Sequence, residues 1–445
     1  MFSSLARPGF RRLRIFIILL CLPLPSFADL VWSVDGSFRL RAETINDTFR
    51  SEGGSDQIAV SRLLVAISAR NDFGHAKLEL IDSRSAFDDS GTPLGNDDVN
   101  TADVLQAYLG LHRDGFYGGT LDLDVGRYTL DLGSRRLVSR NRFRNTLNSF
   151  DGLRSLWRAE DSAVQFFYNY PVLRRPTDRD ALDANRHQAD RHYSGTRFWG
   201  VHAEHLLGQT RHEWYYYGLR ERDQPNLATR NRHLDTVGWR MRNPSPFLGY
   251  EIEAVWQTGR SRASTSASEI VALDHKALFV HGELSHQHGD RLASKVAVLL
   301  DYASGDKSPD DEDNERFDTL FGSRGFDYGP TGIYGAWARA NIVSPGLRWT
   351  GQFSAYSSAQ VTARAYWLAS DRDTLAATGL RDSTGGSASK AGQELDVRLR
   401  RSLGDSVKLE FGGAYLHKSR FMRDTGDPGS QADSVYSYAQ VTFVF

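Results

Sequence analysis

The stretch Glu394-Leu395-Asp396-Val397-Arg398-Leu399-Arg400 alternates charged and apolar residues without a break. Such a period of two indicates a β-strand with one polar and one apolar face. The pattern recurs in 31–43 and 406–417, over the roughly 10 residues that a membrane-crossing strand needs. Charged residues on one face of so many strands would be buried in the core of a sandwich, whereas in a wide barrel they meet water. The sequence therefore predicts an all-β fold, a transmembrane antiparallel β-barrel.

The connections between the predicted strands alternate between short and long. Short turns are predicted at 71–74, 112–118, 159–160, 208, 243–246, 287–290, 351–357 and 404–405. Long polar loops are predicted at 44–57, 84–101, 129–148, 171–195, 222–232, 261–272, 304–333, 371–390 and 418–432. Outer-membrane barrels have short periplasmic turns and long extracellular loops. This division gives about 18 strands with both chain ends on the periplasmic side; 16 is the alternative, because the strands near 130–158 and 334–357 are the least regular.

Composition excludes two broad classes of protein. The 445 residues include 54 Lys+Arg and 55 Asp+Glu, a formal net charge of −1, which argues against a nucleic-acid binder. Hydrophobic residues make up only 40%, too few for a helical membrane protein, yet aromatic residues reach 11%. A polar average with many aromatics is typical of strands that face lipid on one side and water on the other.

The two ends of the chain carry export signals. Residues 1–28 have a basic beginning, a short apolar run and small residues before Asp29, which predicts a secretory signal peptide ahead of one mature barrel, 29–445. The single Cys21 lies in the predicted signal peptide. The final strand ends in Phe445, and a terminal aromatic on such a strand resembles the signal read by the barrel-insertion machinery. We therefore expect a multi-pass barrel in the outer-membrane lipids of a Gram-negative cell.

Candidate catalytic and metal-binding groups are sparse. His286 and His288 lie in a short polar turn without a third ligand nearby, so solvated side chains are favoured over a metal site. The acidic run 310–313 lacks the spacing of a calcium loop, and only a weak calcium option remains. No nucleophile elbow, phosphate loop or zinc-protease helix occurs. We therefore predict neither an enzyme nor a bound cofactor.

Charges predicted to face the lumen point to a selective pore. The inward basic residues with the strongest case are Arg39, Arg41, Arg62, Arg154, Arg364, Arg398 and Arg400, and inward acids are nearly as numerous as inward bases. In one interpretation these charges are cross-strand ion pairs that brace the wall. In the other, a local arginine cluster passes carboxylated sugars, which arginine binds bidentately. Because the first and last strands close the barrel, Arg39, Arg41, Arg398 and Arg400 would share one sector, with Arg154 on the other side.

More specific residues appear at 301–348: Asp301-Tyr302-Ala303-Ser304-Gly305-Asp306, Phe317 to Gly322, Phe326 to Gly332, and Asn341-Ile342. This stretch resembles the alginate-export family of outer-membrane porins, and Glu79 to Arg84, Gly126-Arg127, Arg136 to Val138 and Phe150 to Arg154 fit it too. The resemblance implies a monomeric eighteen-stranded barrel with a narrow arginine-lined pore. It adds Asp82, Arg84, Arg127, Arg136 and Arg154 as candidate pore residues. The balanced lumen departs from the electropositive interior of family members that export alginate.

The resulting functional prediction is a passive exporter of an anionic, alginate-like exopolysaccharide from the periplasm to the exterior. The alternative is a substrate-specific uptake porin for small carboxylates or sugars. An adhesin or barrel enzyme is a weaker third class, and a gated siderophore transporter is disfavoured because no plug domain precedes the barrel.

Overall fold

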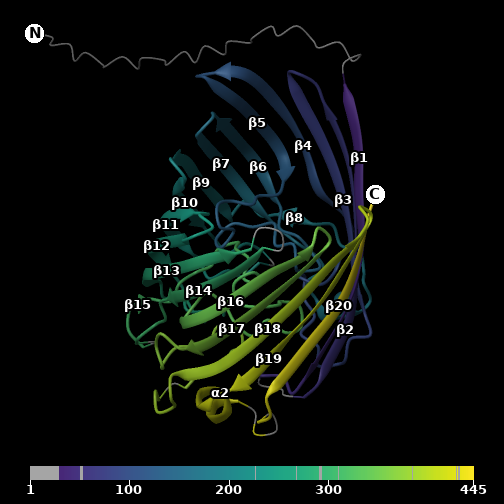
Figure 1. Ribbon diagram of the computed structural model, residues 1–445. Coiled ribbons are helices and arrows are strands. Elements are labelled where there is room, and N and C mark those ends of the chain that lie inside the picture. The colour runs from purple at the N-terminus through teal and green to yellow at the C-terminus, as the bar shows by residue number, and fades with distance from the viewer. Residues whose placement is uncertain are drawn as a thin grey trace, which may run out of the picture.

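The computed structural model describes residues 30–445 apart from 51–53, 226, 267, 290–292, 309, 383, 427 and 429–430. The predicted signal peptide lies outside the described residues. The described chain forms one closed β-barrel whose strands follow one another around the wall in sequence order, from β1 to β20 (Figure 1). No helix among the described residues is long and apolar enough to cross a membrane.

The first half of the wall consists of the strands β1 Val31–Asn46, β2 Asp56–Arg70, β3 Gly74–Ala86, β4 Asn100–Phe116, β5 Gly119–Tyr128, β6 Phe150–Arg158, β7 Ser162–Leu173, β9 Arg197–Leu207 and β10 Thr210–Arg220. The second half consists of β11 His233–Asn243, β12 Gly249–Ser261, β13 Leu273–His288, β14 Ser294–Ala303, β16 Ile342–Ser354, β17 Ser357–Trp367, β18 Lys390–Leu403, β19 Val407–Lys418 and β20 Ser434–Val444. Four short elements lie in the loops: β8 Arg191–His192, β15 Asp313–Asn314, and the helices α1 Arg179–Asp183 and α2 Arg420–Thr425. The wall therefore has eighteen strands, as predicted, and the alternative of sixteen is wrong.

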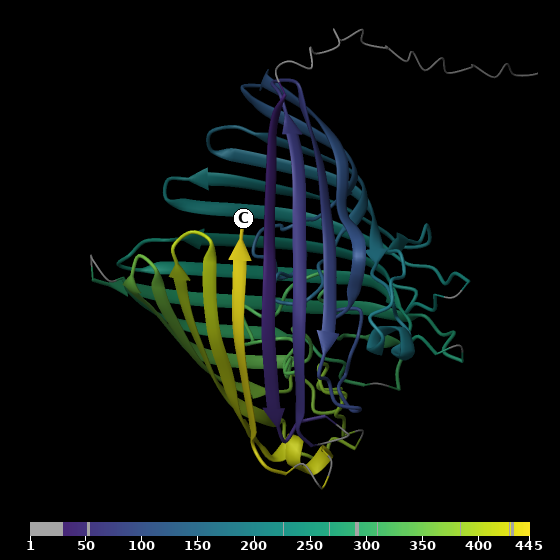
Figure 2. The same cartoon turned by 90° about the vertical axis from the view of Figure 1, so that its right-hand side faces the viewer.

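The barrel closes because β1 pairs antiparallel with both β2 and β20. In Figure 2 the yellow strand β20 runs beside the purple strand β1. The seam is extended past β20 by Phe445, whose backbone N–H donates to Gly36 O at 3.1 Å and whose carbonyl accepts from Gly36 N at 2.7 Å. The Phe445 ring occupies the space where a side chain on Gly36 would stand, so Gly36 makes room for the terminal aromatic. The last residue of the chain thus belongs to the closing ladder.

The two faces of the wall differ as the alternation predicts. Apolar side chains on the outer face remain exposed on the isolated chain, among them Leu109, Val125 and Leu153 at 66%, 62% and 54%. Charged side chains such as Arg39, Glu43 and Asp301 face inward and are buried. Because an outer apolar band is what lipid solvates, this arrangement is that of a membrane barrel.

The lumen is filled in part by two long loops that fold inward, 129–149 between β5 and β6 and 304–341 between β14 and β16 (Figure 1). Leu137, Val138 and Trp337 on these loops are at most 3% exposed and belong to one hydrophobic cluster with inward-facing residues of the wall. The loops touch each other through a parallel bridge between Val138 and Phe321. These loops therefore form a core inside the barrel and narrow its channel.

The predicted turns and loops agree with the observed ones to within a few residues, with one exception. The strand predicted near 334–357 begins later than expected. That strand begins only at Ile342, and 334–341 belongs to the inward loop. Tyr334 and Trp337 both donate hydrogen bonds to Glu394 of β18. The side-chain amide of Asn341 donates to Ser370 O at 3.0 Å. The apolar and aromatic residues of 334–341 resemble the sequence of a wall strand because they are buried. They are buried inside the lumen, however, against the inner face of the wall.

We expect the purified mature protein to give a strand-dominated circular dichroism spectrum in detergent. It should also migrate faster on a gel when unboiled than when boiled. Closure pairs the strand backbone groups around the wall, so opening the barrel requires breaking many hydrogen bonds together. A helix-dominated spectrum would contradict the fold.

We expect Phe445→Lys to lower the amount of protein in the outer membrane, whereas Phe445→Tyr should preserve it. Lysine removes the aromatic ring from the closing strand and places a charge in lipid, while tyrosine keeps the ring over Gly36. Quantitative blotting of outer-membrane fractions measures the difference. Equal levels of the two variants would show that the terminal aromatic is dispensable for insertion.

Candidate functional site: an arginine-lined cavity in the lumen

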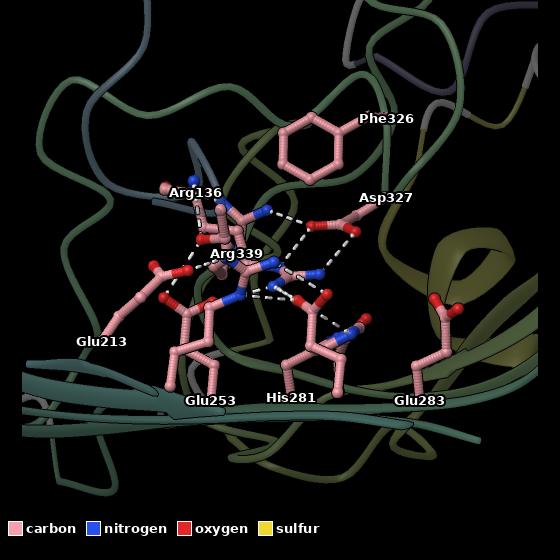
Figure 3. A network of polar contacts seen from close by, with 12 residues as sticks. Arg136, Glu213, Glu253, His281, Glu283, Phe326, Asp327 and Arg339 are labelled. Atoms are coloured by element: carbon pink, nitrogen blue, oxygen red, sulfur yellow. Dashed lines mark hydrogen bonds and ion pairs between the residues drawn. The ribbon is translucent and has the colours of Figure 1, made fainter. Parts of the chain in front are cut away.

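A buried ionic cluster ties the two inward loops to the wall (Figure 3). Arg136 of loop 129–149 pairs through Nε with Asp327 of loop 304–341 at 2.9 Å, and through Nη1 with Glu253 of β12 at 2.7 Å. Arg339 pairs with the same Asp327 at 2.6 Å and donates to the Arg136 carbonyl at 2.9 Å. A buried ion pair that loses one partner leaves an uncompensated charge, so these contacts hold both loops firmly in place.

The charges of this cluster stabilise one another. Burial alone would raise the pKa of Asp327, but Arg136 and Arg339 outweigh it and hold that pKa well below its usual range. Burial likewise opposes the charge of Arg136, yet Asp327, Glu251 and Glu253 raise its pKa above the usual value. Asp327 and Arg136 therefore stabilise each other's charged form.

A second set of contacts attaches loop 129–149 to the opposite side of the lumen. Arg39 of β1 donates through Nη1 to the carbonyls of Arg142 and Phe143 at 3.1 and 3.2 Å, and through Nη2 to Arg144 O at 3.0 Å. Arg62 of β2 donates to Arg144 O at 2.8 Å and Arg142 O at 3.2 Å. Arg39 also donates through Nη2 to the side-chain oxygen of Asn145 at 2.9 Å, so these two arginines meet neutral oxygens instead of carboxylates.

Between this loop and the wall lies a cavity of about 340 Å³. Six arginines and a single acid line it, together with two phenylalanines: Arg39, Arg62, Arg135, Arg142, Arg398, Arg400, Glu410, Phe143 and Phe326. Glu410 is already engaged by Arg400 at 2.7 Å and by the Tyr438 hydroxyl at 2.7 Å. The lining therefore carries a large excess of positive charge, which focuses a positive potential in a confined space.

The predicted pore residues divide into groups. Arg39, Arg62, Arg398 and Arg400 line the cavity, which places them in one sector of the wall; their role in binding substrate stays a prediction. Three others face the lumen but are paired with acids: Arg41 with Glu43 at 2.7 Å, Arg154 with Asp124 at 2.6 Å and Arg364 with Asp301 at 2.8 Å. Arg136 pins the inward loops, as described above. These four residues are thus ion-paired in the structure, as the bracing interpretation expects, and their role in binding substrate stays a prediction.

The interpretation of Asp82, Arg84 and Arg127 as pore residues is wrong, because all three lie on the outer face of the wall. Asp82 and Arg84 share the face of the exposed Leu78 and Leu80 and pair with each other at 2.9 Å.

Arg127 shares the face of Val125 and Leu123 and makes a bidentate pair with Asp151 at 2.7 and 3.0 Å. The family resemblance points to these residue types, but only the strand register shows which face of the wall each of them occupies.

Sequence reasoning missed the loop residues of the cavity, Arg135, Arg142, Phe143 and Phe326. The sequence predicts a polar extracellular loop at 129–148, whereas the observed loop 129–149 enters the lumen. One signal was present: residues 135–144 contain five arginines and no acid, around the apolar pair Leu137-Val138. A basic, partly apolar loop of this kind suits a lumen better than bulk solvent.

Within the described ranges, no group of three or more His, Cys, Asp or Glu side chains is arranged to hold a metal ion. The lining of the cavity offers charge recognition: planar guanidinium groups that bind carboxylates, beside aromatic rings.

We expect Asp327→Asn to release the inward loops while the barrel persists. Removing one partner from a buried ionic cluster costs about 3–5 kcal/mol. Loop 304–341 should then become sensitive to trypsin and single-channel conductance should rise, with the gel shift on boiling retained. Asp405→Asn, in the exposed turn between β18 and β19, is the matched control and should leave both properties unchanged. Unchanged trypsin resistance in Asp327→Asn would show that the cluster does not hold the loop.

The comparisons with known proteins agree with this architecture. Among solved structures, Pseudomonas aeruginosa OpdK with vanillate is similar at a TM-score of 0.58 and 14% identity, covering 93% of this chain and 98% of that chain. Pseudomonas aeruginosa OccK2 (OpdF) matches at 0.58 and 11%, covering 93% and 97%, and Acinetobacter baumannii OccAB1 at 0.58 and 11%, covering 93% and 96%. At these identities the likeness shows a shared outer-membrane porin fold. A comparison with curated protein sequences gave no match.

A family model supplies the closer relationship. The model described as alginate export matches residues 31–435, nearly the whole of the described barrel. The arrangement of an eighteen-stranded wall, inward loops and an arginine-lined lumen is thus that of an outer-membrane channel, and the chain belongs to the alginate-export family.

Proposed function

We propose that this channel exports an anionic exopolysaccharide, of the alginate type, from the periplasm to the exterior by passive diffusion. The observation that carries the proposal is the cavity in which six arginines face a single acid. A polyuronate presents one carboxylate on each sugar, and guanidinium groups bind carboxylates with paired, charge-assisted hydrogen bonds. Family membership supports the same substrate class.

The distribution of lumenal charge explains how a nearly balanced sequence supplies an anion path. On the side of β12 to β14, the acids Glu251, Glu253 and Asp301 are neutralised by Arg136, Arg240 and Arg364. On the side of β1, β2 and β18, the arginines of the cavity have few acidic partners. An anion is therefore attracted to one side of the lumen, where contacts strong enough to attract and weak enough to release allow passage.

A second candidate function, uptake of small carboxylates, is favoured by the size of the cavity. Its volume of about 340 Å³ suits a small acid better than a long polymer as long as both loops stay in place. A structurally similar porin, OpdK, has been solved with vanillate, an aromatic carboxylate. Here the same arginines would select the substrate, and direction of transport would separate the two functions.

We expect the wild-type channel to prefer anions in planar bilayers and to be blocked by oligomannuronate. Arg398→Gln should lower both the anion preference and the block, because it removes a charge from the cavity. Arg401→Gln is the matched control: it lies on the same strand, on the outer face with the exposed Leu399, and should change neither property. A wild-type channel that prefers cations would exclude the anionic substrate.

We expect a strain that makes the polymer but lacks this protein to retain uronate polymer in its periplasm. If the channel instead serves uptake, polymer release should be normal and growth on small carboxylates should fall. Measuring uronic acid in the periplasm and the medium, with growth on aromatic acids as the second assay, distinguishes the two functions.

A further inference from the structure

The backbone carbonyls of residues 142–144 accept hydrogen bonds from the cavity arginines, as the oxygens of a bound substrate would. Arg39 and Arg62 donate to the carbonyls of Arg142 and Arg144, and Arg41 donates to Phe143 O at 2.6 Å. Neither Arg39 nor Arg62 forms an ion pair with a carboxylate in the part of the chain that the structure describes, and the buried Nε atom of each has no hydrogen-bond partner there. Two full positive charges are thus met by neutral oxygens alone.

Such a contact is exchangeable. A guanidinium–carboxylate hydrogen bond is charge-assisted and about twice as strong as one between neutral groups, and a carboxylate can accept from two donors of one guanidinium. A substrate carboxylate in the cavity would therefore compete directly with the carbonyl oxygens for Arg39 and Arg62. Both arginines line the cavity, so a substrate in it can reach them without crossing the wall.

The residues flanking this segment have anchors beyond these arginines, although Arg39 also donates through Nη2 to Asn145 Oδ1 at 2.9 Å. Asn145 is fully buried, and its side-chain amide donates to Asp98 O at 2.8 Å and to Ser61 O at 3.0 Å. On the other side, Ser139 N donates to Phe321 O at 3.1 Å. In contrast, the Arg142 side chain is 69% exposed, and its ion-pair partner Asp131 lies on the same loop. Arg144 pairs with Asp97 through its side chain at 2.9 Å, so the part that can shift between the anchors is the backbone of 142–144 with its carbonyl oxygens.

We propose that segment 142–144 is a resident occupant of Arg39 and Arg62 that substrate carboxylates displace, so that an anionic chain opens its own path through the lumen. This inference rests on the proposed function and adds how the site is regulated. Without polyanion the carbonyls stabilise the arginines and the segment narrows the channel. With polyanion the arginines change partner, the segment leaves the wall and the cavity widens.

A single cysteine reports the movement, because the only natural cysteine, Cys21, precedes the barrel, in the predicted signal peptide. In Phe143→Cys, labelling by a soluble maleimide should be slow in the absence of polymer. Oligomannuronate should raise the rate at least about tenfold, since labelling follows the population of the open form. Maltohexaose, a neutral oligosaccharide of similar size, should not raise it.

Two arginine variants in the Phe143→Cys background separate displacement from simple attraction. Arg62→Gln removes a charge and a contact to the segment, so labelling should be fast without polymer. Arg400→Gln removes a charge from the same cavity but makes no hydrogen bond to the segment, so labelling should stay slow and still respond to polymer. In otherwise wild-type channels, Arg62→Gln should raise the conductance without polymer, whereas Arg400→Gln should not. This conductance reading does not depend on the cysteine.

Failure of the inference and failure of the proposed function give different results. If oligomannuronate blocks the wild-type current but leaves the labelling rate of Phe143→Cys unchanged, and Arg62→Gln does not raise the conductance, the displacement is overturned and the anionic substrate stands. If oligomannuronate neither blocks the current nor changes labelling, the anionic polymer is not the substrate.

Discussion

Pairing of β1 with β20 is the contact on which every other feature of this protein depends. In lipid an unpaired backbone group costs several kcal/mol, so a sheet of this length is stable in a membrane only when its edges meet. The seam includes Phe445, the final residue, whose backbone bonds to Gly36 complete the ladder. Once eighteen strands close, the circumference leaves a lumen too wide for wall side chains alone to fill. That width is what allows charged residues to face inward and two long loops to enter.

The lumen is divided between a core and a site. Aromatic residues such as Trp337 and Tyr334 pack against inward-facing side chains and anchor loop 304–341, and Asp327 joins that loop to loop 129–149. Where acids and arginines meet in this core they neutralise each other. Arg39 and Arg62 lack such partners, and Arg398 and Arg400 share the single acid Glu410, so the cavity carries an excess of positive charge. The numbers of inward acids and bases are nearly equal. These totals do not show the separation, because they do not say which acid lies beside which base.

The strands of the wall could be predicted from the sequence, whereas the loops that fill the lumen could not. Alternation such as that of 394–400 fixes which residues share a face, and the lengths of the connections give the strand number and the side of each loop. Neither feature says that loop 129–149 turns inward, since its arginines also suit a solvated loop. Asp82, Arg84 and Arg127 show the opposite error: residues at the end of a strand can pair on the outer face, where only register with an exposed neighbour such as Val125 reveals their position. The inward buried stretch 334–341 was assigned to a strand because burial against a loop core and burial in a wall select similar side chains.

The cationic site of a channel for a polyanion has to avoid two arrangements. In one, a permanent acidic partner occupies the site; in the other, buried positive charges are left without hydrogen bonds. Pairing Arg39 or Arg62 with a carboxylate of the wall, as Arg154 is paired with Asp124, would remove the site, because a substrate would then have to break a charged pair to bind. Leaving both guanidinium groups without hydrogen bonds in a confined space would destabilise the fold. Backbone carbonyls lie between these limits: they satisfy the donors but carry no net charge, so a carboxylate exchanges with them at a net gain. In the proposed mechanism, the position of segment 142–144 thus lets a folded, narrow lumen coexist with exchangeable binding of anions.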